Sequence, residues 1–229
     1  MINLKEIIGK DIDQIWEDFR EEDFCKFPPC SVESIELSDL IFIGINPSTN
    51  EKEKIRLNAK EDRSCEFYLN EMNIDATHKY FKKFFDIAKH TKSTWTHLDL
   101  LYLRETQQKK VNELLKSPAG VDFVFRQLML SKTIIDKILD DSKPKVFIVN
   151  NTLAREFLGK DRPVSYSEEQ KHWMDYRFKW DEDLGTYRLG KHVFFFTSML
   201  TGQRALDNGS YQRLIWHINF VKRYNKLSI

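Results

Sequence analysis

The sequence predicts an α/β protein with three layers, in which helices cover both faces of a central four-stranded, mainly parallel sheet. Short apolar runs have the composition of strands buried on both faces. Amphipathic segments with helical spacing separate these runs, and parallel strands need such crossover connections. The predicted strands are Leu40–Ile45, Trp95–Tyr102, Lys145–Val149 and His192–Phe196.

The predicted helices follow from the spacing of apolar residues and from capping signals. Residues 3–20 carry apolar side chains at a helical period, so an amphipathic helix precedes the first strand, within an N-terminal helical extension of about residues 1–38. Further helices are expected at 80–88, at 105–116, at 118–141 with Pro118 in its first turn, after Asn150–Thr152, and at 208–224. Residues 176–179 and 186–189 suggest a hairpin.

Composition limits the classes of protein that fit. A chain of 229 residues, 41% hydrophobic, fits one α/β domain spanning residues 1–229. Lys plus Arg (36) nearly balances Asp plus Glu (35), so nucleic-acid binding requires a local basic patch. No apolar run reaches membrane-spanning length and no secretory signal begins the chain, so we expect a soluble, cytoplasmic monomer that does not bind membranes.

The cysteines do not indicate a disulfide framework or a metal site. Cys25 and Cys30 have a spacing that zinc ligands use, but no second pair follows, and Cys65 stands alone. Reduced thiols and no metal are the expectation.

Polar residues follow each predicted strand, where open parallel sheets place their ligands. Asn46 ends the first strand, between Gly44 and Pro47, and Asp99 interrupts the apolar second strand. Burying Asp99 costs free energy unless it is partnered or used in function. The polar stretch 48–64 is long enough to be a functional loop.

The order of these strand ends resembles the uracil-DNA glycosylase superfamily over about residues 38–222. Gly44–Pro47 is similar to the Gly-Ile-Asn-Pro motif of the mismatch-specific branch. The other similar segments are His78–Lys82, Leu98–Arg104, Pro144–Leu158 and Phe196–Leu200, the last at the place of the family's His-Pro-Ser-x-Leu or Asn-Pro-Ser-x-Leu motif.

The resemblance implies a monofunctional DNA glycosylase without a cofactor, which flips out a damaged or deaminated base and hydrolyses its N-glycosidic bond. Asn46 would position the attacking water. It would not act as general base, because an amide cannot accept a proton at neutral pH. The alternative is that the Asn46 side chain caps its own turn.

Other residues take base-binding roles by the same resemblance. Phe67 or Tyr68 would stack on the base, and Ile45 and Asp99 would also contact it. An ionised Asp99 offers only acceptors, which puts uracil recognition in doubt. The alternatives are that the two aromatics belong to the core and that Asp99 pairs with Arg104.

The fourth motif departs most from the family. Phe196 stands where the family's His or Asn stabilises the departing base, and losing one such donor costs about 2.7–4 kcal/mol. This departure motivates a second hypothesis, a catalytically silent relative that binds DNA or a lesion. Contacts to DNA are expected from Ser48, Ser198, Leu200 as a wedge, Gln203 and Arg204, although Ser198 is alternatively a helix cap and Leu200 a core residue. A basic rim is expected from Lys82, Lys83, Arg104, Lys109 and Lys110.

Overall fold

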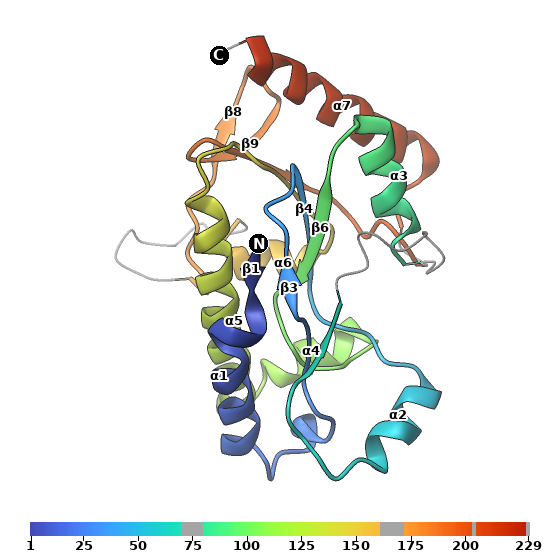
Figure 1. Cartoon of the computed structure of the whole chain (residues 1–229), viewed down its shortest axis with the longest axis vertical. Coiled ribbons are helices and arrows are strands. Elements are labelled where there is room, and N and C mark those ends of the chain that lie inside the picture. Colours follow the sequence, from blue (N-terminus) through green and yellow to red (C-terminus); the bar gives the residue numbers. More distant parts are fainter. Residues whose placement is uncertain (70–79, 161–171, 203–204, 228–229) are drawn as a thin grey trace. The chain divides into compact units, whose positions relative to one another are not determined.

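The computed structural model describes residues 1–69, 80–160, 172–202 and 205–227 (Figure 1). Contacts divide the chain into two compact units. Unit 1 comprises Met1–Ile35, Ile45–Asn70 and Leu98–Ile138, and unit 2 comprises Glu36–Gly44, Glu71–His97 and Leu139–Ile229. The expectation of a single domain remains a prediction.

A six-stranded mixed, mainly parallel sheet forms the centre of the α/β fold, in the order β6-β4-β7-β10-β9-β8. Its strands are β4 (Leu40–Gly44), β6 (Trp95–Asp99), β7 (Val146–Val149), β8 (Lys179–Asp181), β9 (Thr186–Leu189) and β10 (His192–Phe196). In the central parallel pairs, Val149 is in register with both Ile43 and Phe196. The carboxyl ends of β4, β7 and β10 therefore lie at one edge.

The prediction of a four-stranded sheet is wrong because the predicted hairpin joins the sheet. Gly190, at a φ of 58°, and Lys191 form a tight turn that folds β9 back along β10. His192 thereby pairs with Leu189 in an antiparallel ladder, and β8 extends the sheet from β9. The positive φ is one that glycine adopts without strain.

Helices flank the sheet. On one face, α3 (Lys82–Thr91) and α7 (Asn208–Leu227) pack against apolar side chains from β4, β7 and β10. Phe42 of β4 stacks on Phe84 of α3, with ring centroids 4.4 Å apart. Alternate strand residues face the other way, where the rings of Phe147 and Phe194 stack at 4.3 Å. α6 (Thr152–Leu158), which follows β7, buries Phe157.

Unit 1 is built around long helices and short strands. Its helices are α1 (Leu4–Asp18), α2 (Glu51–Asn58), α4 (Gln108–Leu114) and all but the last residue of α5 (Pro118–Leu139), and η1 (Asp23–Cys25) is a short 3₁₀ turn. Trp16, Phe19 and Phe24 surround Phe123 of α5, with ring centroids 4.7–5.3 Å apart. This cluster joins α1 to α5.

The N-terminal extension is not wholly helical, which corrects the expectation for residues 1–38. β1 (Ile2–Asn3) pairs with β3 (Ser34–Ile35), and β2 (Cys30–Val32) pairs with β5 (Glu66–Tyr68). Strands of two or three residues are too short to show a period in the sequence. The polar stretch 48–64 contains α2, which the Asn50 side chain caps by accepting from the Glu53 N–H.

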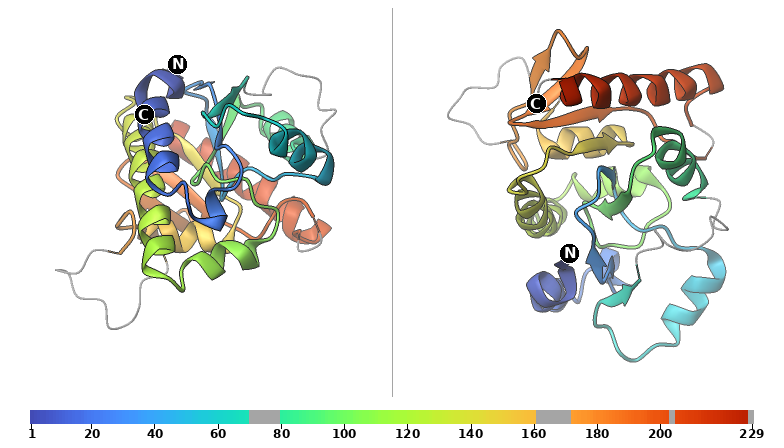
Figure 2. Two further views of the ribbon diagram at one scale, coloured as in Figure 1. Left: turned by 90° about the horizontal axis from the view of Figure 1, so that it is seen from below. Right: turned by 45° about the horizontal axis from the view of Figure 1, so that its top comes forward.

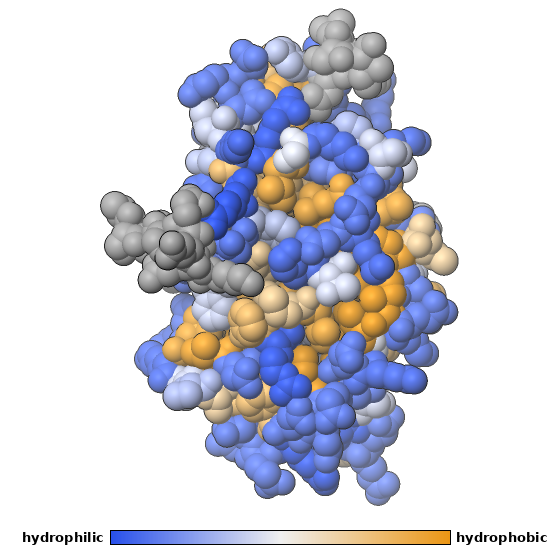
Figure 3. Space-filling model, turned by 90° about the vertical axis from the view of Figure 1, so that its left-hand side faces the viewer, coloured by the Kyte–Doolittle hydropathy of each residue, from blue (hydrophilic) through white to orange (hydrophobic). Residues whose placement is uncertain are grey.

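Hydrophilic side chains cover much of the face in Figure 3, with apolar groups exposed among them. No helix in the described part of the chain is both long enough and apolar enough to cross a membrane.

Candidate functional site

Asp99 is the last residue of β6, and it lines a small hollow of unit 1. The hollow is also lined by residues from α1, β2, β5 and the segments next to them, among them Cys30, Ser31, Pro47, Tyr68 and Tyr102. Its free volume is about 10 Å³, which is room for about one water molecule. A nucleobase therefore does not fit without movement of the lining residues.

The electrostatic state of Asp99 follows from the protein that surrounds its carboxyl. Within the described ranges, no hydrogen bond or ion pair to the Asp99 side chain is present. Removal from water disfavours the charged form, so burial raises the pKa of Asp99 to about 7. A carboxyl of this kind exchanges protons near neutral pH, and such groups are concentrated at functional sites.

Arg104 does not pair with Asp99, so that alternative for Asp99 is wrong. The Arg104 guanidinium forms ion pairs with Glu66 and Glu53 and donates to the Pro28 carbonyl at 3.2 Å. A hydrogen bond from Arg56, together with Lys60 and Arg104, lowers the pKa of Glu66 to about 2. Arg104 is therefore held in a carboxylate network, and the expectation that it belongs to a basic rim is also wrong.

Asn46 holds the chain that follows Asp99. Its Nδ2 lies 2.9 Å from the carbonyl oxygen of Pro47, 3.3 Å from that of Leu103 and 2.5 Å from that of Glu105. Backbone bonds run beside this amide, from Leu101 N–H to the Ile45 carbonyl and from Glu105 N–H to the Pro47 carbonyl. The geometry thus favours the alternative of a turn-stabilising amide, extended to a second segment.

Tyr102 lines the hollow, and hydrogen bonds from its backbone and its hydroxyl hold it in place. The Tyr102 N–H donates to Oε1 of the buried Gln127, and the Tyr102 hydroxyl lies 2.8 Å from the Ser131 hydroxyl. The Cys30 N–H in turn donates to the Tyr102 carbonyl at 2.9 Å. Sequence reasoning missed Tyr102 and Cys30 because no local pattern shows that β2 and α5 meet the chain after β6.

The two candidate aromatics differ in their surroundings. Tyr68 lines the hollow with Asp99, whereas the Phe67 ring packs against Gly9 of α1, 3.4 Å from where a β-carbon would be. The alternation of side chains along β5 points them in opposite directions. Tyr68, not Phe67, therefore accompanies Asp99.

The remaining candidates near Asn46 are distributed over the surface and the core. Ile45 is buried, with 9% of its surface exposed, and Ser48 is exposed. Neither lines the hollow at Asp99.

The residues after β7 and β10 belong to unit 2. Asn151 caps α6, because its Oδ1 accepts from the N–H groups of Leu153 and Ala154. Ser198 is exposed after β10. Leu200 is 2% exposed and belongs to the core, so the expectation of a wedge is wrong and the alternative of a core leucine is correct. Gln203 and Arg204 lie outside the described residues, as do His78 and Lys79.

Phe196 is half-buried and lies among other aromatic rings. Its centroid lies 5.0 Å from that of Phe178 and 5.5 Å from that of Tyr187. The Lys160 ammonium lies 4.6 Å from the Tyr187 centroid and 5.8 Å from that of Phe196. Phe196 itself offers no hydrogen-bond donor to a departing base.

Three of the four lysines of the expected basic rim interact with neighbouring side chains. Lys109 pairs with Glu113 at 3.9 Å, and Lys110 pairs with Glu105 at 3.5 Å. The Lys83 ammonium lies over the Tyr211 ring at 3.9 Å, and Lys82 is exposed.

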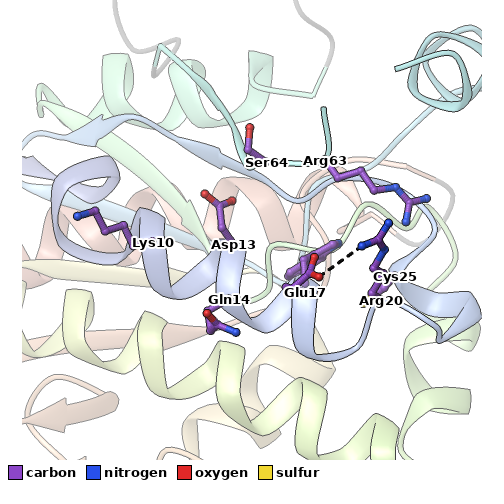
Figure 4. A pocket seen from close by; sticks show the side chains of 9 residues that line it. Lys10, Asp13, Gln14, Glu17, Arg20, Cys25, Arg63 and Ser64 are labelled. Atoms are coloured by element: carbon purple, nitrogen blue, oxygen red, sulfur yellow. Dashed lines mark hydrogen bonds and ion pairs between the residues drawn. The ribbon is translucent and has the colours of Figure 1, made fainter. Parts of the chain in front are cut away.

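A larger groove of about 460 Å³ runs along α1 in unit 1 (Figure 4). Its polar groups bond mainly to one another or to the backbone: Glu17 pairs with Arg20, Asp13 accepts from the Cys65 N–H, and Arg63 donates to the Lys26 carbonyl. Burial raises the pKa of Cys25, which also lines the groove, to about 12, so this thiol is a poor nucleophile. The groove is a weaker candidate than the hollow at Asp99.

A metal site is not indicated within the described ranges, where no three His, Cys, Asp or Glu side chains are grouped to hold an ion. Comparison with known protein families, curated proteins and solved structures finds no match for the chain.

Proposed function

We propose that the protein hydrolyses the N-glycosidic bond of a damaged or deaminated base in DNA, with Asp99 as general base. The observation that carries the proposal is a carboxyl of pKa about 7, without a partner in the described part of the chain, beside a hollow with room for about one water molecule. A general base works best when its pKa is near the working pH. The resemblance of the strand-end motifs to uracil-DNA glycosylases supplies the substrate class.

In the proposed reaction Asp99 activates the attacking water as general base, and the water-positioning role that the resemblance gave to Asn46 is not used. Ionised Asp99 accepts a proton from the water, the water oxygen bonds to the sugar C1′, and the C1′–N bond breaks as the base takes its electron pair. Asn46 supports the reaction indirectly, since its amide holds the segment after Asp99. Tyr68 lines the hollow with Asp99 and Tyr102, and of the two aromatic candidates on β5 it is the one placed to contact a base there.

The test is excision of bases from oligonucleotides that carry uracil, hypoxanthine, xanthine, or alkylated or oxidised bases, in single and double strands. We expect abasic product on at least one, with a rate that rises with pH to a plateau above about 7, where Asp99 is ionised. Asp99→Asn should lower the rate roughly 10²–10⁴-fold, the usual contribution of a general base.

Asp122→Asn is the matched control, because Asp122 is an exposed carboxylate of α5. It should leave the rate unchanged. The absence of abasic product on every substrate, or a rate that Asp99→Asn does not change, contradicts the proposal.

The apolar ring of Phe196, which packs against Phe178 and Tyr187, favours a second candidate function, binding of DNA or a lesion without excision. Without a donor at this position, the departing base loses a stabilising hydrogen bond. This candidate is supported if the protein binds lesion-bearing DNA in a salt-dependent way and releases no base. It fails if no such binding occurs.

A further inference from the structure

The outer face of α7 carries a row of exposed aromatic rings. Trp216, Phe220 and Tyr224 are spaced four residues apart, which places them on one side of a helix. The rings of Trp216 and Phe220 stack at 5.7 Å, and those of Phe220 and Tyr224 lie 6.2 Å apart. Trp216 is 66% exposed, whereas Trp95 in the core of the same unit is 7% exposed. Exposed apolar side chains that lie next to one another often mark an interaction site.

Positive charge accompanies the rings. α7 contains four Lys or Arg residues and no acidic one, although the whole chain has a net charge of only +1. Arg213 and Arg223 are exposed on the same side of the helix as Trp216 and Phe220. Arg213 donates to the Ser210 hydroxyl at 2.9 Å, and no carboxylate of the described chain forms an ion pair with Arg223.

The neighbouring helix extends the positive charge. α3 packs beside α7, where the Asn219 amide donates to the His90 carbonyl and the Lys222 ammonium to the Thr91 carbonyl. α3 contributes Lys82, Lys83 and Lys89 against a single acidic residue, Asp86. Three acidic groups lie close to α7: Asp207 accepts from Ser210 near its start, Asp183 accepts from the Tyr224 hydroxyl near its end, and Asp86 of α3 acts electrostatically on Tyr211 in its first turn. The middle of the face is therefore basic.

The types of side chain on this face of α7 favour nucleic acid over a membrane or an apolar protein surface as the binding partner. Beyond the first turn of α7, the exposed side chains in the described part of the helix are Gln212, Arg213, Trp216, Phe220, Arg223 and Tyr224. They are rings, guanidinium groups and an amide, with no aliphatic side chain. A membrane or an apolar protein groove favours aliphatic side chains as well, whereas bases stack on rings and phosphates bind arginine. In Figures 1 and 2 one long side of α7 is left uncovered by the other elements of unit 2.

We infer that the face formed by Arg213, Trp216, Phe220 and Arg223 binds single-stranded nucleic acid, with bases stacked on the rings and phosphates at the arginines. Single strands fit better than duplex, because paired bases keep their faces inside the stack. Binding here uses no residue of the Asp99 site, so it does not depend on the proposed hydrolysis.

The experiment measures the affinity of the full-length protein for fluorescently labelled dT₂₀, rU₂₀ and a 20-base-pair duplex by anisotropy at several salt concentrations. We expect both single strands to bind more tightly than the duplex. Trp216→Ala should weaken single-strand binding about tenfold. Replacing Arg213 and Arg223 together by Gln should lower the slope of log affinity against log salt by about 1.4.

Two control variants test whether binding depends on this face of α7. Trp180→Ala removes another exposed tryptophan of unit 2, 49% exposed on β8, and should leave the affinity within about twofold. Asp99→Ala should leave the affinity for single strands unchanged. This result is expected whether or not the protein excises bases, so it separates binding at α7 from the proposed hydrolysis.

Several results would overturn the inference. They are an absence of salt-dependent binding to either single strand, an affinity that Trp216→Ala leaves unchanged, or a preference for the duplex. Trp216-dependent binding to vesicles of anionic lipid, or Trp216-dependent self-association, with no single-strand binding, would assign the face to another occupant.

Discussion

Asp99 and Asn46 show how the surroundings of a residue decide its chemistry. Asn46 follows an apolar strand and Asp99 lies within one, and the sequence marks both as polar groups where a ligand would bind. In the structure, the amide of Asn46 is used by backbone carbonyls, and the carboxyl of Asp99 has no described partner. Asp99 is therefore the residue whose polar group is available for chemistry.

The raised pKa of Asp99 predicts a loss of stability as pH increases. The folded-state pKa, about 7, lies above the unfolded value of 3.8. Asp99 therefore destabilises the folded state least below about pH 4, where it is protonated in both states. Its destabilising effect grows as pH rises and is complete above about pH 7. Asp99→Asn removes the ionisation, and we expect it to raise the free energy of unfolding at pH 8 by on the order of 4 kcal/mol, with little change at pH 4.

Urea unfolding at pH 4 and pH 8 measures this difference. Asp122→Asn, on an exposed carboxylate, serves as the control at both pH values. A gain from Asp99→Asn that is equal at the two pH values would contradict the raised pKa.

Replacing Asn46 tests its structural role. Asn46→Ala removes hydrogen bonds to carbonyls of two segments, and we expect the free energy of unfolding to fall by about 2 kcal/mol. Asn46→Asp should cost more, because a carboxylate would face the same carbonyl oxygens.

The matched control for this test is Asn58→Ala, at an exposed position near the end of α2, which should change stability by less than about 0.5 kcal/mol. If both Asn46 variants unfold at the wild-type urea concentration, the amide does not hold the loop.

At the scale of elements, strong local patterns predicted the central strands and the long helices. The runs around Phe42, Phe147 and Phe194 form β4, β7 and β10, since short, nearly continuous apolar runs are typical of strands buried on both faces. Pro118 begins α5, as its fixed φ and missing N–H favour. The short strands β1, β2, β3 and β5 were not predicted, because each is ordered by its pairing partner and not by its own sequence.

Close packing of α4 and α5 depends on Gly120. A β-carbon at this position would lie 2.1 Å from the Leu114 carbonyl oxygen. Alanine normally stabilises a helix interior by about 1 kcal/mol relative to glycine. Here we expect Gly120→Ala to destabilise by about 1–3 kcal/mol, because α4 must shift.

The sign of the change in thermal or urea unfolding decides this prediction. Val121→Ala, at the next and exposed position of α5, controls for substitution in the same turn. A Gly120→Ala protein that is more stable than the wild type would show that the two helices do not pack this closely.

For the whole molecule, the fold protects its thiols. Cys25 and Cys30 are buried, Cys65 is half-buried, and none forms a disulfide. Burial raises the pKa of Cys30 to about 11 and that of Cys25 to about 12, and it also raises the pKa of Cys65. At pH 8 the three groups are therefore almost entirely protonated.

We expect the native protein to react slowly with a thiol reagent at pH 8, and all three cysteines to react at once in urea, because the thiolate is the reactive form. Absorbance of the released thiol product gives both the rate and the number of groups. Fast labelling of any thiol before unfolding would contradict the burial of these side chains.

The sequence by itself determined the α/β class, the positions of the buried strands and the residues that follow them. These features depend on local periodicity, on apolar composition and on the backbone preferences of proline and glycine. Only the tertiary structure decided that the hairpin joins the sheet, that Arg104 pairs with Glu66 and not with Asp99, and that Leu200 is buried. The physical reason is that hydrogen-bond partners, burial and pKa depend on groups brought together from distant parts of the chain, which no local pattern records.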